Sequence, residues 1–304
     1  MIGSGLRFAA IDIGSNAIRL LFTRVIEGNG NSEPFFIKES LIRMPLRLGQ
    51  DVFNDGSISK NNSKSFINTI SGFKYLLDAY QPINYRACAT AAMRNAKNNV
   101  DLIRKVKNHS GVNIEIISGS EEASLILGKN INQYLKQNKT YLHIDVGGGS
   151  TELSIISKGI KRFSKSFSIG SVRLLEKKVK KAQWEEMYKW LTNHTKSIGK
   201  IKAIGSGGNI NKISSMLGVN KGEMIKLGSI KNIIEEINNK TINERITLLG
   251  LRPDRADVIT YASKIYISCM EWSGAKKIIV PQSGLADGIV NQLYKKYING
   301  INVS

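Results

Sequence analysis

Short apolar runs on either side of a glycine turn are the clearest feature of the hydrophobic pattern, and they occur twice. Residues 7–26 and residues 143–156 each contain an apolar run, a tight turn with glycine, and a second apolar run. Runs of this length bounded by turn residues are typical of buried β-strands. We therefore expect two β-hairpins, one near the N-terminus and one near the middle of the chain.

Helical and extended segments alternate through the rest of the chain. Apolar residues recur with helical spacing over 63–80 and 183–198, and helices are also expected from 119 to about 135 and from about 257 to 273. Two short helices are expected within 229–250, and a last helix opens at 283. The further strands that the pattern predicts are 35–42, 85–89, 114–117, 160–167, one that starts at 202, and 278–280. This alternation is typical of an α/β fold.

The two hairpins are copies of one pattern. Ala10–Arg19 and His143–Glu152 align at an offset of 133 residues, so that Asp12 meets Asp145 and Arg19 meets Glu152. A long-range repeat with two copies indicates a duplicated domain and not a solenoid. We expect two related α/β lobes, residues 1–135 and 136–304, that face each other across a cleft for anionic ligands. The last helix could cross back and pack on the first lobe.

The turn of the second hairpin carries residues suited to phosphate and metal binding. Three consecutive glycines, 147–149, have no Cβ, so their backbone N–H groups can approach a phosphate oxygen. Asp145 and Glu152 flank the turn and can hold a divalent cation or a water, and Ser150 adds a hydroxyl. The structural alternative is a tight hairpin with acidic flanks, but the second copy favours the functional interpretation. A further glycine loop at 205–208 could hold a base, a ribose or a phosphate.

Three other side chains are candidates for phosphate binding or catalysis. The guanidinium of Arg19 matches phosphate geometry, although a surface arginine on a strand is the alternative. Arg94 lies in the first turn of a helix after a short strand, which suits either an anion site or an ordinary strand–helix junction. Glu122 also lies in a first helical turn, where a carboxylate can orient and deprotonate a water. Its neighbour Glu121 has capping-box spacing from Ser118, which is a structural role.

Composition limits the class of protein. A length of 304 residues suits two domains, and 41 % hydrophobic and 22 % charged residues are ordinary for a soluble globular protein. Cys88 and Cys269 are far apart and predict neither a disulfide framework nor a zinc site. No signal-peptide pattern and no apolar run of membrane-spanning length is visible. We therefore expect a cytoplasmic protein that does not bind membranes.

The net charge of +20 arises from 44 lysines and arginines against 24 acidic residues. A positive field of this size can recruit polyanions. The abundance of lysine, asparagine and isoleucine is also expected from AT-biased codons, so both explanations stay open. No basic run with interleaved aromatic residues occurs, which favours a phosphate polymer over nucleic acid. We expect no specific nucleic-acid partner.

Five motifs follow one another in a fixed order along the chain. They are Asp12-Ile-Gly-Ser-Asn…Arg19, Ala89-Thr-Ala-Ala-Met-Arg94, Ile117-Ser-Gly-Ser-Glu-Glu-Ala123, Asp145-Val-Gly-Gly-Gly-Ser-Thr-Glu152 and Gly205-Ser-Gly-Gly-Asn209. Together they resemble the exopolyphosphatase / guanosine pentaphosphate phosphohydrolase (Ppx/GppA) family, within the actin-like ATPase superfamily. The resemblance covers nearly the whole chain, and the length matches the short members of the family. It implies two duplicated ribonuclease-H-like lobes around a central cleft, and hydrolysis of a terminal phosphoanhydride with release of orthophosphate.

The resemblance also implies roles for individual residues. Glu122 matches the family's catalytic acid, and Asp145 and Glu152 match acidic residues linked to Mg²⁺ and water, which makes all three catalytic. The implied phosphate-binding residues are Asp12, Gly14, Ser15, Asn16, Arg19, Arg94, Gly147, Gly148, Gly149, Ser150, Gly205, Ser206, Gly207, Gly208 and Arg255. Mg²⁺ is the implied cofactor, and polyphosphate and guanosine penta- or tetraphosphate are the implied ligands.

The chain departs from the family pattern at three places. Ser124 stands for an arginine, Ala262 for a glycine, and Ala286-Asp287-Gly288 for an arginine-glutamate-glycine signature. Chain-length preference and guanine-nucleotide binding therefore stay open. Two other functions remain as alternatives, an actin-like kinase or ATPase and a non-catalytic module that senses polyphosphate or guanosine tetraphosphate. The oligomeric state is open as well, a homodimer included.

Overall fold

The computed structural model describes residues 5–28 and 33–300 of the chain. Contacts divide these residues into two compact units, each built on one β-sheet. Unit 1 contains the described residues of Met1–Ser118 and Leu285–Ser304, and unit 2 contains Gly119–Gly284. The C-terminal helix therefore completes the N-terminal unit.

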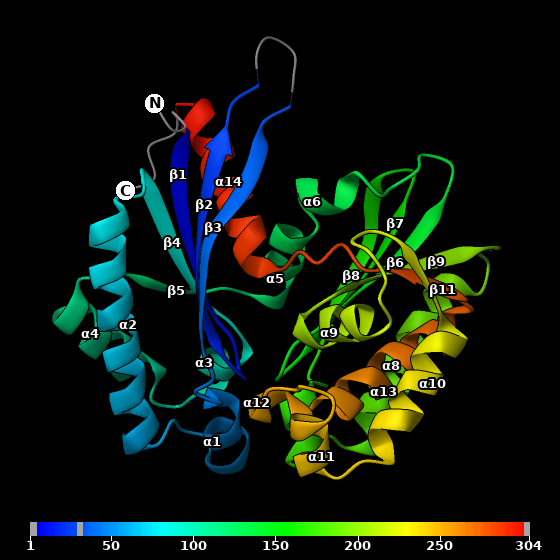
Figure 1. Ribbon diagram of the computed structural model, residues 1–304. Helices are drawn as coiled ribbons and strands as arrows, with labels where there is room; N and C mark the ends of the chain where they lie inside the picture. The colour runs from blue at the N-terminus through cyan, green and yellow to red at the C-terminus, as the bar shows by residue number, and fades with distance from the viewer. Residues whose placement is uncertain (1–4, 29–32, 301–304) are drawn as a thin grey trace. The chain divides into compact units, whose positions relative to one another are not determined.

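Unit 1 is a mixed sheet with helices on its faces (Figure 1). In the strand order β3-β2-β1-β4-β5, β1 (Leu6–Ile13), β2 (Ile18–Ile26) and β3 (Phe35–Met44) are antiparallel neighbours, and β4 (Asn84–Ala89) and β5 (Ile114–Ile116) continue the sheet in parallel. Its helices are α1 (Leu48–Asp55), α2 (Lys60–Tyr80), α3 (Ala91–Asn95), α4 (Asn99–Ser110) and α14 (Leu285–Ile298). The predicted apolar stripe of α2 is buried at Phe66, Ile70, Phe73 and Leu77.

Unit 2 has the strand order β10-β11-β9-β6-β7-β8. β6 (Thr140–Val146), β7 (Thr151–Ser157) and β8 (Ile160–Phe167) are antiparallel, β9 (Ile201–Ser206) and β11 (Lys277–Ile279) run parallel to β6, and β10 (Met224–Lys226) is an antiparallel edge strand. Its helices are α5 (Gly119–Ile126), α6 (Lys129–Asn132), α7 (Ser171–Leu175), α8 (Lys181–Thr195), α9 (Gly208–Met216), α10 (Leu227–Asn238), α11 (Ile242–Thr247), α12 (Pro253–Ala256) and α13 (Ile259–Ser273).

The two sheets confirm the duplication that the hairpin repeat predicts. The order β3-β2-β1-β4-β5 corresponds to β8-β7-β6-β9-β11 in sequence and in strand direction, and β10 is an addition to unit 2. The registers agree as well, because Asp12 pairs with Arg19 across the first hairpin and Asp145 pairs with Glu152 across the second. The predicted α/β class with two related lobes is therefore confirmed.

The helices that follow β5 and β11 are exchanged between the units. α5 follows β5 in sequence but packs on β7 and β8, whereas α14 follows β11 but packs on β1, β2 and β4. The boundaries at Ser118 and Leu285 thus differ from the expected ranges 1–135 and 136–304. The physical reason is that the buried side chains of α5, which include Ala123 and Ile126, find their partner strands after the helix and not before it.

Two local elements also differ from expectation. Residues 48–55 form the short helix α1, which is not among the helices expected above. Leu48, Val52 and Phe53 give it a buried apolar face. The helix expected to run from 119 to about 135 is interrupted, since α5 ends at Ile126 and α6 begins after Gly128. Glycine weakens a helix because it lacks a side chain and has a large backbone entropy in the unfolded chain.

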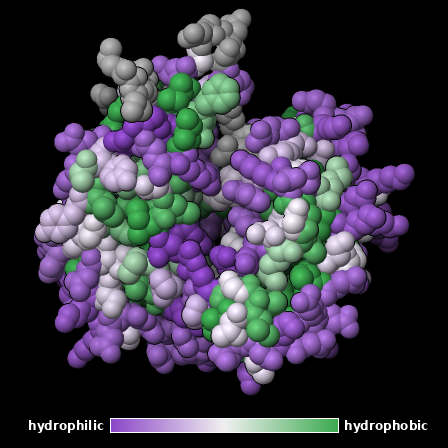
Figure 2. Space-filling model, in the orientation of Figure 1, coloured by the Kyte–Doolittle hydropathy of each residue, from purple (hydrophilic) through white to green (hydrophobic). Residues whose placement is uncertain are grey.

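Hydrophilic side chains dominate the face of the molecule shown in Figure 2, as expected from the high charge. The apolar side chains collect in the interior of each unit, for example Phe8, Phe22 and Phe66 in unit 1 and Leu142, Ile144 and Leu153 in unit 2. Cys88 and Cys269 are both free and buried. Burial raises the pKa of the Cys269 thiol, which therefore stays protonated and unreactive.

Candidate active site

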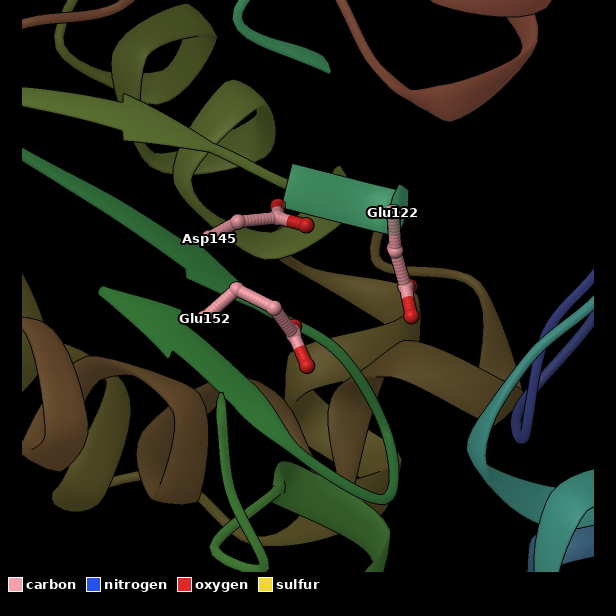
Figure 3. Close-up of side chains that lie close together, drawn as sticks. All are labelled: Glu122, Asp145 and Glu152. Carbon is pink, nitrogen blue, oxygen red and sulfur yellow. The ribbon is translucent and has the colours of Figure 1, made fainter. Parts of the chain in front are cut away.

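Three carboxylates from different elements converge in unit 2 (Figure 3). Glu122 lies in the first turn of α5, Asp145 near the end of β6, and Glu152 near the start of β7. One oxygen of each lies within 4.8 Å of the others, and the residues are 8 %, 7 % and 1 % exposed. Buried like charges at this spacing repel one another, and a cation between them would stabilise the arrangement. We call these three residues the acidic cluster.

Two serine hydroxyls orient Glu152 within the acidic cluster. Ser150 Oγ and Ser166 Oγ donate to Glu152 Oε1 at 2.8 and 2.7 Å, and Ser166 lies opposite Glu152 in the β7–β8 register. Gly119 begins α5 beside this pair, where an added Cβ would lie 2.6 Å from Cβ of Ser166. The missing side chain of Gly119 therefore lets the helix that carries Glu122 approach the hairpin that carries the other two carboxylates.

We expect Gly119→Ala to lower any catalytic activity of the acidic cluster by at least about tenfold, because the new Cβ displaces Ser166 and with it Glu152. Overpacking of this kind costs about 1–3 kcal/mol of stability, which denaturant unfolding would measure. Gly72→Ala is the matched control, since no atom lies within 4 Å of a Cβ at this position of α2. Full activity in Gly119→Ala would contradict the positioning role of Gly119.

The glycine turn 147–149 is held so that its N–H groups face away from α7. Its three carbonyls accept hydrogen bonds from Ser171 N, Val172 N and Arg173 Nε at 2.9–3.0 Å. Because a trans peptide points its C=O and N–H in opposite directions, the N–H groups of Gly148, Gly149 and Ser150 point the other way. In the described chain these three donors reach no protein acceptor, which is the state of an anion-binding loop. Gly170 permits the packing, since a Cβ there would lie 2.5 Å from Gly148 C.

The turn of the first hairpin repeats this arrangement in unit 1. The carbonyls of Ser15 and Asn16 accept from Gly49 N and Arg47 N at 2.8 and 3.1 Å, so the following N–H groups face away from α1. Gly14 closes the turn through its N–H to the carbonyl of Ala17. The two flanks differ in charge, however. Asp12 is paired with Arg19 at 2.6 Å, whereas the equivalent Asp145 faces Glu152. The duplicated fold thus has one charge-paired turn and one acidic turn.

The family model described as the Ppx/GppA phosphatase family matches residues 40–297. The chain belongs to the Ppx/GppA phosphatase family.

Curated Ppx/GppA relatives match most of this chain but only part of their own length. A bifunctional 3-dehydroquinate synthase/phosphatase of Fusobacterium nucleatum is 28 % identical, covering 93 % of this chain and 47 % of that protein. A guanosine-5'-triphosphate,3'-diphosphate pyrophosphatase of Vibrio cholerae is 26 % identical, and the match covers 94 % of this chain and 59 % of that protein. Exopolyphosphatase 1 of Mycobacterium bovis is 28 % identical, and the match covers 56 % of this chain and 48 % of that protein. The chain spans about half of the length of the curated relatives it matches.

Solved structures of the Ppx/GppA family share the fold over nearly full length. The family member from Aquifex aeolicus has a TM-score of 0.76 at 24 % identity, with 98 % of this chain and 99 % of that chain covered. An exopolyphosphatase from Cytophaga hutchinsonii has a TM-score of 0.81 at 22 % identity, with 97 % of this chain and 99 % of that chain covered. In the part of the chain that the structure describes, no helix is both apolar and long enough to span a bilayer.

The third glycine loop approaches the acidic cluster through its backbone and not through the Ser206 hydroxyl. Gly205 lies inside β9, and a Cβ there would meet Ile278 at 2.7 Å. Ser206 is fully buried, with its hydroxyl 2.9 Å from Nε2 of His143. Gly207 adopts a φ of +119° at the start of α9, and an added Cβ there would lie 3.5 Å from Asp145 Oδ1. Gly207 therefore lies beside Asp145, and the phosphate contacts of loop residues 205–208 stay predictions.

Tyr266 and His143 support this corner of the Ppx/GppA site, and sequence reasoning missed both roles. The Tyr266 hydroxyl donates to the carbonyl of Ser206, next to Gly207. Burial and the nearby charge of Asp145 raise the pKa of Tyr266 well above its usual value, so it stays a protonated donor. Burial lowers the pKa of His143 to about 3, so this imidazole is neutral near pH 7. In sequence Tyr266 is one more member of an apolar helical face, and no local signal separates it from core packing.

We expect Tyr266→Phe to lower kcat several-fold and to cost about 1–3 kcal/mol of stability, because the buried carbonyl of Ser206 loses its donor beside Asp145. Tyr141→Phe is the control, since Tyr141 is equally buried and its hydroxyl accepts from Lys136 N away from the acidic cluster. Phosphate release and denaturant unfolding of both variants separate the two effects. An equal loss of kcat in the two variants would show that only general stability matters.

Of the three predicted phosphate-binding arginines, Arg94 and Arg255 lie on separate units. Arg94 of α3 donates through Nη1 to the carbonyl of Ile117 at 2.5 Å, which ties α3 to the end of β5 in unit 1. Arg255 lies on α12 of unit 2, between the buried residues Asp254 and Ala256. Their phosphate contacts stay predictions. The three departures from the family pattern lie outside the acidic cluster, with Ser124 accepting from Lys161 Nζ at 2.7 Å and Asp287 paired with Lys38 at 2.7 Å.

The acidic cluster fits a hard divalent cation. Its ligand atoms are all carboxylate oxygens, which Mg²⁺ and Ca²⁺ prefer, and it contains no nitrogen or sulfur ligand among the described residues. Two oxygens on one Mg²⁺ lie at most about 4.2 Å apart, and on one Ca²⁺ about 5 Å. A spread of up to 4.8 Å therefore suits Mg²⁺ if one carboxylate moves slightly or binds through water. If Asp145 and Glu152 alone bound the cation, Glu122 would be available for another role.

Proposed function

We propose that this Ppx/GppA family member is a Mg²⁺-dependent hydrolase that releases orthophosphate from the ends of inorganic polyphosphate, guanosine pentaphosphate, or both. The observation that carries the proposal is the acidic cluster beside a glycine turn whose N–H groups have no protein acceptor. The glycine turn can bind anions and the acidic cluster can bind a cation. Phosphoanhydride hydrolysis requires this combination.

The proposed division of labour follows from the position of each group. The N–H groups of Gly148, Gly149 and Ser150 hold the oxygens of a terminal phosphate. Asp145 and Glu152 hold the cation, and Ser150 and Ser166 fix the orientation of Glu152. When bound, Mg²⁺ supplies the positive charge that offsets charge on the phosphate oxygens. Glu122 approaches from α5 and accepts a hydrogen bond from the attacking water.

The proposed reaction balances without a further reactant. The water oxygen forms a bond to the terminal phosphorus while the bond from that phosphorus to the bridging oxygen breaks. Glu122 takes one proton of the water, and the bridging oxygen leaves with the shortened chain. The products are orthophosphate and a substrate shorter by one phosphate.

Two substrate classes suit the proposal, and relatives carry both names. The Vibrio cholerae relative is named for guanosine-5'-triphosphate,3'-diphosphate, and the Mycobacterium bovis relative is named an exopolyphosphatase. Both substrates end in a phosphoanhydride that the glycine turn can hold. At Ser124, where the family pattern has arginine, Lys161 reaches the serine hydroxyl and supplies a positive charge from β8.

Parallel phosphate-release assays test the proposed function. Long polyphosphate, short polyphosphate and guanosine pentaphosphate are each incubated with the wild-type protein and Mg²⁺, and orthophosphate is measured over time. Release from at least one substrate, abolished by EDTA, supports the proposal. No release from any of them would overturn it, and tight binding without release would favour a sensor. Transfer of label from ATP to a small metabolite would favour a kinase.

A further inference from the structure

A row of four lysines crosses the sheet of unit 2, at the ends of the strands that lie away from the acidic cluster. The lysines are Lys226 on β10, Lys277 on β11, Lys202 on β9 and Lys139 just before β6. Lys226 pairs directly with Lys277, and the register of Ile278 with Ala203 places Lys277 beside Lys202. Neighbouring strands lie about 4.8 Å apart, so the row extends over about 14 Å. We call these four residues the lysine row.

The side chains of the lysine row point to one face of the sheet. Lateral partners in a sheet share a face, which applies to Lys226, Lys277 and Lys202. Lys139 lies just before β6 and acts electrostatically on Lys202, so it lies near the same face. The Nζ of Lys202 reaches Sδ of Met224 at 3.7 Å, across β11, which confirms its direction.

The surroundings of Lys202, in the middle of the lysine row, are positively charged. Burial, together with repulsion from Lys139, Lys136 and Lys277, lowers the pKa of Lys202. Every charged group that acts on Lys202 is another lysine. Like charges on neighbouring strands destabilise a sheet, so the arrangement has a cost that a chance distribution of solvated lysines would avoid. A bound polyanion would remove that cost.

The lysine row is separate from the acidic cluster. Lys202 precedes Ser206 by four residues and Lys139 precedes Asp145 by six, which corresponds to about 13 and 20 Å along the strands. Tyr141 and His143 lie between the two sites on the same face, and both are buried. A ligand on the lysine row therefore does not touch the glycine turn.

We propose that the lysine row is a binding site for a linear phosphate polymer, distinct from the site of hydrolysis. A straight line of ammonium groups on adjacent strands matches closely spaced charges along one chain. Lysine binds phosphate as a point charge and makes no base-specific contacts. Proteins that bind single-stranded nucleic acid add exposed aromatic side chains on which bases stack, whereas Tyr141 beside Lys202 is 2 % exposed. The site requires binding only, so it does not depend on the proposed hydrolysis.

The binding test uses the whole protein in EDTA with medium-length polyphosphate, whose length is checked before and after the measurement. The double variant Lys202→Gln/Lys277→Gln should bind polyphosphate about tenfold more weakly at low salt, and the slope of log affinity against log salt should fall by about two. Binding of tripolyphosphate, too short to span the row, should change little. The matched control is Lys189→Gln/Lys196→Gln, which removes the same charge from exposed positions on and next to α8.

Each outcome of the binding test decides the proposal. Loss of polyphosphate affinity in the row variant, with the control within about twofold of wild type, supports it. Equal affinities and slopes in the two variants would overturn it and leave general charge as the explanation. A loss confined to single-stranded RNA or to poly-glutamate, measured in parallel, would also overturn it in favour of another polyanion. The row variant should in addition melt at a higher temperature than wild type in the absence of ligand, because the repulsion is relieved.

Discussion

The variant Glu122→Gln should lose a factor of about 10²–10⁴ in kcat with little change in KM. The substitution keeps the size of the side chain in the first turn of α5 but removes its ability to take a proton from water. Substrate binding depends instead on the glycine turn and on the cation, neither of which loses a group. Initial rates of orthophosphate release over a range of substrate concentrations measure both constants.

Glu121→Gln is the matched control for Glu122→Gln, because it removes the same charge from the same helical turn. Glu121 is half-buried and is not part of the acidic cluster. It should keep kcat within a few-fold of wild type. If the two variants lose activity equally, the first turn of α5 matters only through its charge. If Glu122→Gln keeps full activity, another group activates the water.

The second large effect concerns the cation. Wild-type protein should gain about 2.7 kcal/mol in the free energy of unfolding at a Mg²⁺ concentration of 100 times Kd, because only the folded state holds the acidic cluster together. Asp145→Asn should gain less than about 0.5 kcal/mol and should lose more than about a hundredfold in kcat, since cation stabilisation of the phosphate charge is worth several kcal/mol. Without Mg²⁺ the variant should be at least as stable as wild type, because one of three repelling charges is removed.

The duplicated fold supplies the control for Asp145→Asn. Asp12 occupies the equivalent position in unit 1 but is paired with Arg19 at 2.6 Å. Asp12→Asn should therefore keep the full stabilisation by Mg²⁺. Denaturant unfolding of the three proteins with and without Mg²⁺ makes the comparison. Similar stabilisation in wild type and Asp145→Asn would place the cation elsewhere.

Features with a local or repeated pattern could be predicted from the sequence. The two hairpins, their common register and the pairing of Asp145 with Glu152 follow from one alignment of the chain with itself. Short apolar runs predicted most strands, and helical apolar spacing predicted the helix α2, because burial dictates both patterns. The structure also brings Glu122 to Asp145 and Glu152, as expected if all three belong to one site.

Features that depend on distant partners could not be predicted in the same way. The exchange of α5 and α14 between the units is decided by which sheet buries their apolar faces, and each helix directly follows a strand of the other sheet. Tyr266 reaches Ser206 across 60 residues, and the lysine row gathers residues from 139 to 277. In each case nothing in the local sequence marks these residues. Their shared roles depend on which distant segments the fold brings together.

The most direct test of the central claim is the fate of solvent oxygen during turnover. Polyphosphate and guanosine pentaphosphate are hydrolysed with Mg²⁺ in water enriched in oxygen-18, and the products are analysed by mass spectrometry. Attack of water on the terminal phosphorus beside the acidic cluster predicts one solvent oxygen in each orthophosphate released and none in the shortened substrate. Label in the shortened substrate, or no release of orthophosphate from either compound, would contradict the account.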